Sequence, residues 1–105
     1  MPQEWIMEEA LTLWGEEAQL LMVVEEMGEL SHEILKYLRA NTFEEAEIRT
    51  RIAAEHADVS IMLDQLAFMM GKYDKEQAPY STLKREFTVE KVIRLVNRLE
   101  RSKER

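Results

Sequence analysis

The most regular hydrophobic pattern in the chain runs through residues 16–39. Apolar residues recur there at alternating intervals of three and four, the repeat that places side chains on one face of an α-helix. These residues are Leu20, Val23, Met27, Leu30, Ile34 and Tyr37. The tripeptide Ala40-Asn41-Thr42 then breaks the pattern. The spacing therefore predicts one long helix that packs along a continuous apolar seam.

Capping and breaking residues predict one further helix on each side of this one. Residues 3–14 form the first, which ends before Gly15. Thr42 and Glu45 have the spacing of a capping box, in which each side chain hydrogen-bonds the backbone N–H of the other residue. They predict a helix that begins near Thr42 and reaches about residue 70, with Gly71 placed to end it.

The last part of the chain is predicted to hold a linker and a fourth helix. Residues 72–87, which include Pro79, form the linker, and Thr88 caps a helix over residues 88–103. The two longest helices are joined by a short turn and so form an αα-hairpin. We therefore expect a single all-α domain over residues 1–105, folded as a helical bundle of about four helices.

The width of the apolar face predicts self-association. The helix over residues 16–39 is apolar around well over half of its circumference, which is more than one partner helix covers. A homo-oligomer, most simply a twofold dimer, would bury the remainder. An ordinary monomeric bundle is the alternative.

Composition supports the helical prediction and narrows the function. The chain has only 3 Gly and 2 Pro, and residues of high helix propensity dominate it. The absence of cysteine excludes disulfides, thiolate metal sites and a cysteine nucleophile. The chain starts without a signal-peptide pattern, and its longest apolar run, residues 20–24, is too short to span a membrane. We expect a soluble, cytoplasmic protein with no membrane partner.

The net charge of −7 bears on the substrate. Nucleic acids are bound through clustered positive charge, so an acidic chain argues against a nucleic-acid partner. Residues 1–70 carry most of the carboxylates, whereas residues 84–105 are rich in Lys and Arg. A polyanionic small substrate fits the acidic part only if metal cations neutralise the site.

Two acidic pairs stand on the two longest predicted helices. Glu26 and Glu29 are three residues apart, as are Glu55 and Asp58, so each pair lies on one helix face at a Cβ separation of about 5–6 Å. Glu25 precedes Glu29 by one turn and extends the first pair. If the two helices pack antiparallel, four or five carboxylates converge between them.

Glu55 lies within the apolar arc of its helix, and Asp58 lies at the edge of that arc. A carboxylate buried there loses hydration, which costs several kcal/mol, roughly, unless a positive charge compensates. Arg51, one turn earlier, is a candidate counter-charge. Converging carboxylates otherwise require protonation or a hard cation, and an all-oxygen ligand set favours Mg²⁺ or Mn²⁺. The alternative is that these are ordinary solvated acidic faces, since 21 of the 105 residues are acidic.

These residues carry a resemblance to a known family. The pattern is Glu25-Glu26-x-x-Glu29, then 25 intervening residues, then Glu55-x-x-Asp58, preceded by Trp14-Gly15-Glu16-Glu17-Ala18-Gln19 and closed by Gly28-Glu29-Leu30. It resembles the MazG family of all-α nucleoside triphosphate pyrophosphohydrolases over about residues 14–70.

The resemblance implies a dimer or tetramer in which Mg²⁺ is held by four carboxylates, Glu26, Glu29, Glu55 and Asp58. It implies that Glu25 is a further ligand or the base that activates water. The implied reaction splits the α–β phosphoanhydride of a nucleoside triphosphate or deoxynucleoside triphosphate, giving the monophosphate and pyrophosphate. Sanitation of the nucleotide pool is the implied role.

Contacts to the substrate are expected at both ends of the motif. In MazG-like enzymes basic and amide residues of later helices hold the triphosphate, which makes candidates of Lys91, Arg94, Asn97 and Arg98. A solvated basic helix is the alternative for these four. Trp14 is a candidate for stacking on the base and Gln19 for hydrogen-bonding it, although a Trp at a helix end is often a core residue.

Two other classes of function stay open at this point. One is a helical interaction or regulatory protein whose acidic helices bind a basic partner without chemistry. The other is a di-iron carboxylate protein, because His32 follows Glu29 by three residues. Such bundles need Glu-x-x-His on two helices, and Asp58 stands where the second His belongs. His32 is therefore expected on the surface or at an interface, and His56 points away from the site of Glu55.

Overall fold

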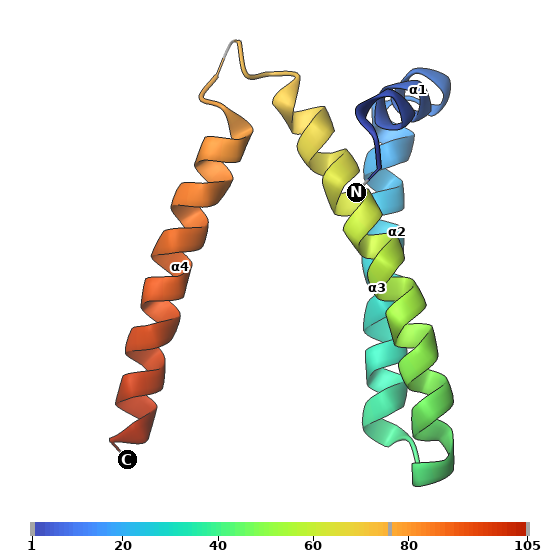
Figure 1. Ribbon diagram of the computed structural model, residues 1–105, viewed down its shortest axis with the longest axis vertical. Helices are drawn as coiled ribbons and strands as arrows, with labels where there is room; N and C mark the ends of the chain where they lie inside the picture. The colour runs from blue at the N-terminus through green and yellow to red at the C-terminus, as the bar shows by residue number, and fades with distance from the viewer. Residues whose placement is uncertain (1, 76, 105) are drawn as a thin grey trace. The chain divides into compact units, whose positions relative to one another are not determined.

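The computed structural model describes residues 2–75 and 77–104, and these residues form four α-helices and no strand (Figure 1). The helices are α1 (Glu4–Trp14), α2 (Glu16–Arg39), α3 (Thr42–Gly71) and α4 (Tyr80–Lys103). The predicted all-α class is therefore confirmed. The chain divides into two compact units, which meet between Met69 and Met70 and are described separately below.

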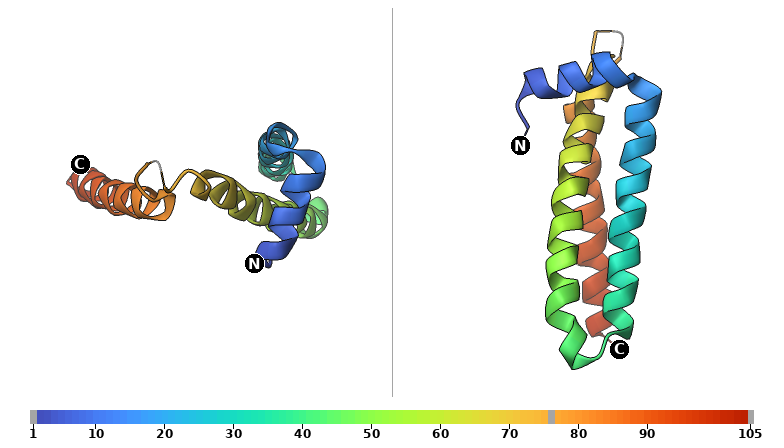
Figure 2. Two further views of the ribbon diagram at one scale, coloured as in Figure 1. Left: turned by 90° about the horizontal axis from the view of Figure 1, so that it is seen from above. Right: turned by 90° about the vertical axis from the view of Figure 1, so that its right-hand side faces the viewer.

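The first unit is an antiparallel hairpin of α2 and α3 with α1 lying across its open end (Figure 2, right). Two contacts far apart in sequence fix the register of the hairpin. Arg51 pairs with Glu33 near the turn, with 3.2 Å between Nε and Oε2. The amide of Gln65 donates to Oε1 of Gln19 near the open end, at 3.1 Å.

Gly15 separates α1 from α2. Its φ of 87° and ψ of 157° lie in a region that is open essentially to glycine alone. The backbone N–H of Gly15 donates to the carbonyl of Leu11 at 2.9 Å, which closes the last turn of α1. This one sharp change of direction is what turns α1 across the end of the hairpin instead of continuing into α2.

The turn of the hairpin uses a capping box one residue earlier than predicted. The backbone N–H of Glu44 donates to Oδ1 of Asn41 at 3.0 Å, and the N–H of Asn41 donates to Oε1 of Glu44 at 3.2 Å. The predicted pair, Thr42 with Glu45, was therefore wrong. Asn is at least as good an N-cap as Thr, and Asn41 also has a Glu three residues later.

The side of α2 that faces α3 differs from the predicted seam. The buried residues of α2 are Gln19, Val23 and Glu33, and Glu26 and Leu30 are half-buried between them. Three members of the predicted seam are 43% exposed each: Met27, Ile34 and Tyr37. The prediction was thus wrong for half of the seam, because α2 carries more apolar surface than one neighbouring helix covers, and α3 lies on the more polar side of it.

The core of the hairpin is contributed mainly by α3. Its buried residues recur at helical spacing along one face: Ile48, Val59, Met62, Gln65 and Met69. Glu55 is half-buried in the same row. Met69 is completely buried. The row confirms the placement of Glu55 on the apolar face of its helix, which was expected from the sequence.

The second unit consists of the end of α3, a loop and α4, and α4 begins eight residues before the predicted start. Pro79 precedes the first residue of α4, and Oδ1 of Asp74 accepts a hydrogen bond from the backbone N–H of Tyr80 at 3.0 Å. Thr88 caps nothing, since its hydroxyl donates to the carbonyl of Lys84 inside the helix at 2.7 Å. Thr can satisfy its hydroxyl in this way within a helix, so the predicted cap was wrong.

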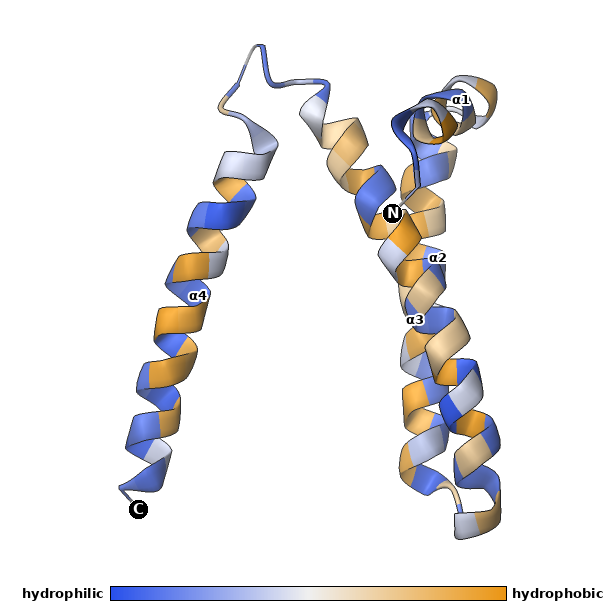
Figure 3. Ribbon diagram, in the orientation of Figure 1, coloured by the Kyte–Doolittle hydropathy of each residue, from blue (hydrophilic) through white to orange (hydrophobic). Residues whose placement is uncertain are grey.

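Hydrophobic residues recur along α2 and α4 (Figure 3). Many of their side chains are exposed. None of the described residues of α4 is buried, and Val92, Val96 and Leu99 are each about half exposed. Within the described residues no helix combines the length and apolarity that crossing a membrane requires.

Candidate metal centre

Three carboxylates converge in the middle of the hairpin. Glu26 and Glu29 reach from α2 and Glu55 from α3, and one oxygen of each lies within 4.8 Å of the other two. The two helices can bring these groups together because each seam carries a Glu at a position that would otherwise be apolar. The structure therefore places three of the four predicted metal ligands in one cluster.

Asp58 and Glu25 lie outside this cluster. Asp58 is exposed one turn beyond Glu55, outside the group of three, but its charge acts on both Glu26 and Glu55. Glu25 is exposed on α2 and is likewise outside the group. The fourth ligand and the base of the resemblance are thus at the solvent side of the cluster, not within it.

Two oxygens of the cluster are buried without a hydrogen-bond partner, Oε2 of Glu26 and Oε2 of Glu55. Burial raises the pKa of Glu26 above its ordinary value of 4.5, and the charges of Glu29, Asp58 and Glu55 raise that pKa further. Burial also raises the pKa of Glu55, followed by the charges of Glu29 and Asp58. Ionised carboxylates in this arrangement lack compensation from the protein.

A third buried carboxylate in the same interface provides a contrast. Glu33 is 8% exposed, and it accepts hydrogen bonds from Arg51 and from Lys36, with N–O distances of 3.2 and 3.3 Å. Burial by itself would raise the pKa of Glu33, but these two cations outweigh it and the pKa is lowered. The fold therefore does neutralise one buried carboxylate of this seam with its own cations.

Arg51 is committed to that network and not to the cluster. Besides Glu33 it pairs with Glu47, at 2.9 Å between Nη1 and Oε1. The sequence-based assignment of Arg51 as the counter-charge of Glu55 was therefore wrong. Within residues 2–75 and 77–104, no ion pair reaches Glu26, Glu29 or Glu55.

The donor set fits a hard divalent cation. Its ligand atoms are all carboxylate oxygens, which Mg²⁺ and Mn²⁺ prefer. Neighbouring oxygens of an octahedral Mg²⁺ stand about 3 Å apart. The three carboxylate oxygens lie within 4.8 Å of one another, so the Glu side chains would have to close further around an ion. A cation there would also give the two orphaned oxygens a partner.

The predicted base contacts fall at the open end of the hairpin. Gln19 is buried, with 3% of its surface exposed, and bonds to Gln65. Trp14, the last residue of α1, is 60% exposed, so it is not a core residue of the described unit. His32 and His56 are both exposed and stand outside the group of three carboxylates, as expected.

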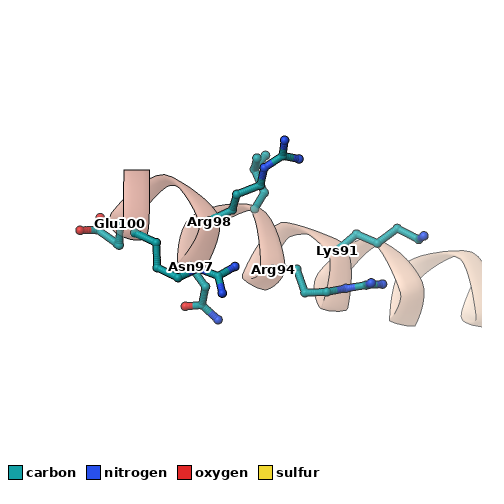
Figure 4. Close-up of a pocket in the computed structure, with 7 residues that line it drawn as sticks. Lys91, Arg94, Asn97, Arg98 and Glu100 are labelled. Atoms are coloured by element: carbon teal, nitrogen blue, oxygen red, sulfur yellow. The ribbon is translucent and has the colours of Figure 1, made fainter. Parts of the chain in front are cut away.

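The predicted phosphate contacts are exposed residues of α4. Lys91, Arg94, Asn97 and Arg98 line a shallow depression along this one helix (Figure 4). Their side chains leave the helix in different directions, and Arg94 pairs with Glu90 at 3.4 Å. In the second unit by itself they form a basic surface, and their role as phosphate ligands stays a prediction.

Gln65, which bonds to Gln19 at the open end of the hairpin, was not predicted from the sequence as a site residue. It is 3% exposed, and its Oε1 is buried without a partner. Its signal was available: it stands three residues after Met62 and four before Met69, so an amide occupies a core position of the helix. A neutral polar side chain within such a row indicates either a buried hydrogen-bond pair or a ligand contact.

Comparison with known proteins adds no assignment. No family model matches the chain, and neither the curated proteins nor the solved structures include a match. The geometry of the carboxylates and the motif of the sequence are therefore what bears on function.

Proposed function

We propose that this protein is a Mg²⁺-dependent nucleoside triphosphate pyrophosphohydrolase of the MazG type. The proposed reaction adds water across the α–β phosphoanhydride of an NTP or dNTP and yields the monophosphate and pyrophosphate. The observation that supports it most is the cluster of Glu26, Glu29 and Glu55. Two of its oxygens are buried without a hydrogen-bond partner, and no ion pair among the described residues reaches it. A cytoplasmic role in nucleotide-pool sanitation belongs to the same proposal.

The contrast with Glu33 is the reason for preferring a metal site to a structural cluster. In one and the same helix interface, Glu33 pairs with two cations, whereas no cation of residues 2–75 and 77–104 pairs with the converging group. Buried charge without a compensating partner strongly destabilises a fold. Clusters of this kind are therefore typical of functional sites. A divalent cation would neutralise the carboxylates of the cluster and would attract a polyphosphate to an otherwise acidic surface.

The residues of the chain have separable tasks in this proposal. Glu26, Glu29 and Glu55 hold the ion, with Asp58 one turn away as a fourth oxygen donor. When bound, Mg²⁺ neutralises phosphate charge and polarises the scissile bond. Glu25, which is exposed on α2, is the candidate for accepting a proton from the attacking water. The basic residues of α4 are the candidates for binding the remaining phosphate charge.

Product analysis tests the reaction. The protein is incubated with Mg²⁺ and each of the common NTPs and dNTPs, and pyrophosphate is separated from orthophosphate. Pyrophosphate is expected with the wild type, none with Glu55→Gln, and wild-type amounts with Glu45→Gln, which removes the same charge from an exposed position of the same helix. Full turnover in Glu55→Gln, or none in the wild type with Mg²⁺ or Mn²⁺, contradicts the proposal and leaves the non-catalytic interaction protein.

We also infer that the working form is a homo-oligomer. Half-exposed apolar residues follow α4, which buries none of its described side chains, and others follow the face of α2 turned away from α3. The charge is uneven too: residues 1–69 carry 15 acidic and 4 basic residues, whereas residues 70–105 carry 6 and 10. Apolar stripes and opposite charges on one chain favour association with further copies. Sedimentation equilibrium showing a monomer at every concentration would contradict this inference.

A further inference from the structure

A second cavity is lined by residues of α1, α2 and α3. These helices meet at the end of the hairpin that α1 crosses (Figure 2). Its volume is about 190 Å³, and its walls are almost entirely apolar, with Ile6, Trp14, Met22 and Ile61 among them. The side chains of Gln19 and Gln65 also line it. A small apolar cavity with a few fixed polar groups is the usual form of a site for a small organic ligand.

The hydrogen bonds of the two amides determine which of their atoms remain available. Nε2 of Gln65 donates to the carbonyl of Met7 and to Oε1 of Gln19, both at 3.1 Å. These bonds occupy the nitrogen of Gln65 and the oxygen of Gln19. Oε1 of Gln65 is left buried with no partner, and Nε2 of Gln19 has a sulfur, Sδ of Met22, at 3.8 Å.

Two residues that line the cavity therefore carry one unpartnered acceptor and one weakly bonded donor. Met22 is 38% exposed, and a Met side chain adapts to a ligand more readily than a branched residue does. A planar ring that displaces the thioether of Met22 would contact the two amides with its edge and the apolar walls with its faces. A nucleobase has this chemistry, because it is flat and carries an N–H donor beside an acceptor at its edge.

The distance from the carboxylates suits a nucleotide. Gln19 precedes Glu26 by seven residues on α2, and Gln65 follows Glu55 by ten on α3. Seven residues of helix rise about 10 Å. The cavity therefore lies about two turns from Glu26 along α2 and nearly three turns from Glu55 along α3, a span that one extended nucleoside triphosphate can cover.

We propose that this cavity is a nucleobase site, in which Gln65 accepts a hydrogen bond from the base and Gln19 donates one. The proposal rests on the proposed function for its substrate class, since it deepens that function by assigning the base to the end of the hairpin under α1. Trp14 lies at the same cavity and supplies a ring face to the ligand. An apolar cavity without a cation excludes the phosphates, which therefore point toward the carboxylates.

Nucleoside binding without metal tests this site separately from hydrolysis. Adenosine, guanosine, cytidine, uridine and thymidine are titrated against the full chain in EDTA, and binding is followed by ligand-observed NMR. At least one nucleoside is expected to bind to the wild type. Ile61→Trp fills the cavity from its 49% exposed wall without altering either amide, and it should weaken that binding at least tenfold.

The matched control is Leu63→Trp, which adds the same ring at a 44% exposed position of α3 away from the cavity. It should bind the nucleoside as the wild type does. Gln65→Leu, checked for folding by circular dichroism, should lose the binding as well. Absence of binding to the wild type, or equal binding by Ile61→Trp and Leu63→Trp, overturns the base site.

The same variants separate the two proposals. If Ile61→Trp hydrolyses NTPs with an unchanged KM, the base site is overturned, whereas the proposed pyrophosphohydrolase activity is supported. If nucleosides bind as expected and no NTP is hydrolysed, the base site is supported and the pyrophosphohydrolase is overturned.

Discussion

Replacing two glycines by alanine is expected to change stability in opposite directions. Gly15, between α1 and α2, has the positive φ of 87° with a ψ of 157°, whereas Gly28 lies within α2 with ordinary helical geometry. A Cβ built at either position meets no atom within 4 Å. The two substitutions therefore differ in backbone conformation and not in packing, so the comparison isolates the strain at Gly15.

The magnitudes follow from the backbone angles. A side chain in the region of Gly15 costs about 1–3 kcal/mol. Alanine in place of glycine inside a helix gains about 0.5–1 kcal/mol. For a domain of this size 1 kcal/mol corresponds to about 4–8 °C in Tm. Gly15→Ala should therefore lower the Tm by at least several degrees, and Gly28→Ala should raise it slightly.

Thermal and urea unfolding followed by circular dichroism measure both changes. Gly15→Ala should also weaken nucleoside binding, because the turn at Gly15 sets α1 across the hairpin and so forms the cavity. An unchanged or raised Tm in Gly15→Ala would refute the strained turn. A lowered Tm in Gly28→Ala would mean that another surface packs against α2 at that point.

Three further predictions concern charge. In metal-free protein the free energy of unfolding should rise as the pH falls from 7 to about 5, because the folded-state pKa values of Glu26 and Glu55 are raised above 4.5 and protonation relieves their repulsion. Saturating Mg²⁺ should remove this rise. A metal-free free energy of unfolding that does not change with pH would contradict the prediction. Arg51→Met should destabilise the protein most above pH 4.5, and progressively less as the pH falls through the lowered pKa of Glu33. Urea titrations at several pH values measure this change in stability. A loss of stability that does not depend on pH would disprove the ion pair between Arg51 and Glu33. Arg98→Ala should raise the KM for NTP several-fold with an unchanged circular dichroism spectrum, and an unchanged KM would remove Arg98 from the phosphate contacts.

The helices were predictable where a residue of restricted conformation marks their ends. Gly15 and the break at Ala40 gave the bounds of α2 as the structure has them, Glu16–Arg39. Where two residues compete as caps, sequence reasoning chose the wrong one. Asn41 takes the place expected for Thr42, and the start of α4 follows Pro79 instead of Thr88. A capping residue alone does not decide such choices, because Asn41 and Thr42 each have a Glu three residues later.

The site was predictable to the extent that it depends on spacing within one helix. The i, i+3 pairs predicted that four carboxylates converge, and the structure groups three of them, Glu26, Glu29 and Glu55, but not Asp58. The spacing of residues within one helix does not determine the register between two helices. Arg51 faces Glu33, eighteen residues earlier in the chain, and the bond from Gln65 to Gln19 spans forty-six. Both contacts follow from how far α3 slides along α2, which no pattern within one helix determines.

Metal binding by the hairpin is the claim on which the account rests. Thermal unfolding is measured in EDTA and in excess Mg²⁺ for the wild type, Glu55→Gln and Glu45→Gln. A ligand at 100 times its Kd stabilises the native state by about 2.7 kcal/mol. The account predicts a clear rise in Tm for the wild type and for Glu45→Gln, and a small or absent rise for Glu55→Gln. The same response to Mg²⁺ in all three proteins, or none in the wild type, would contradict it.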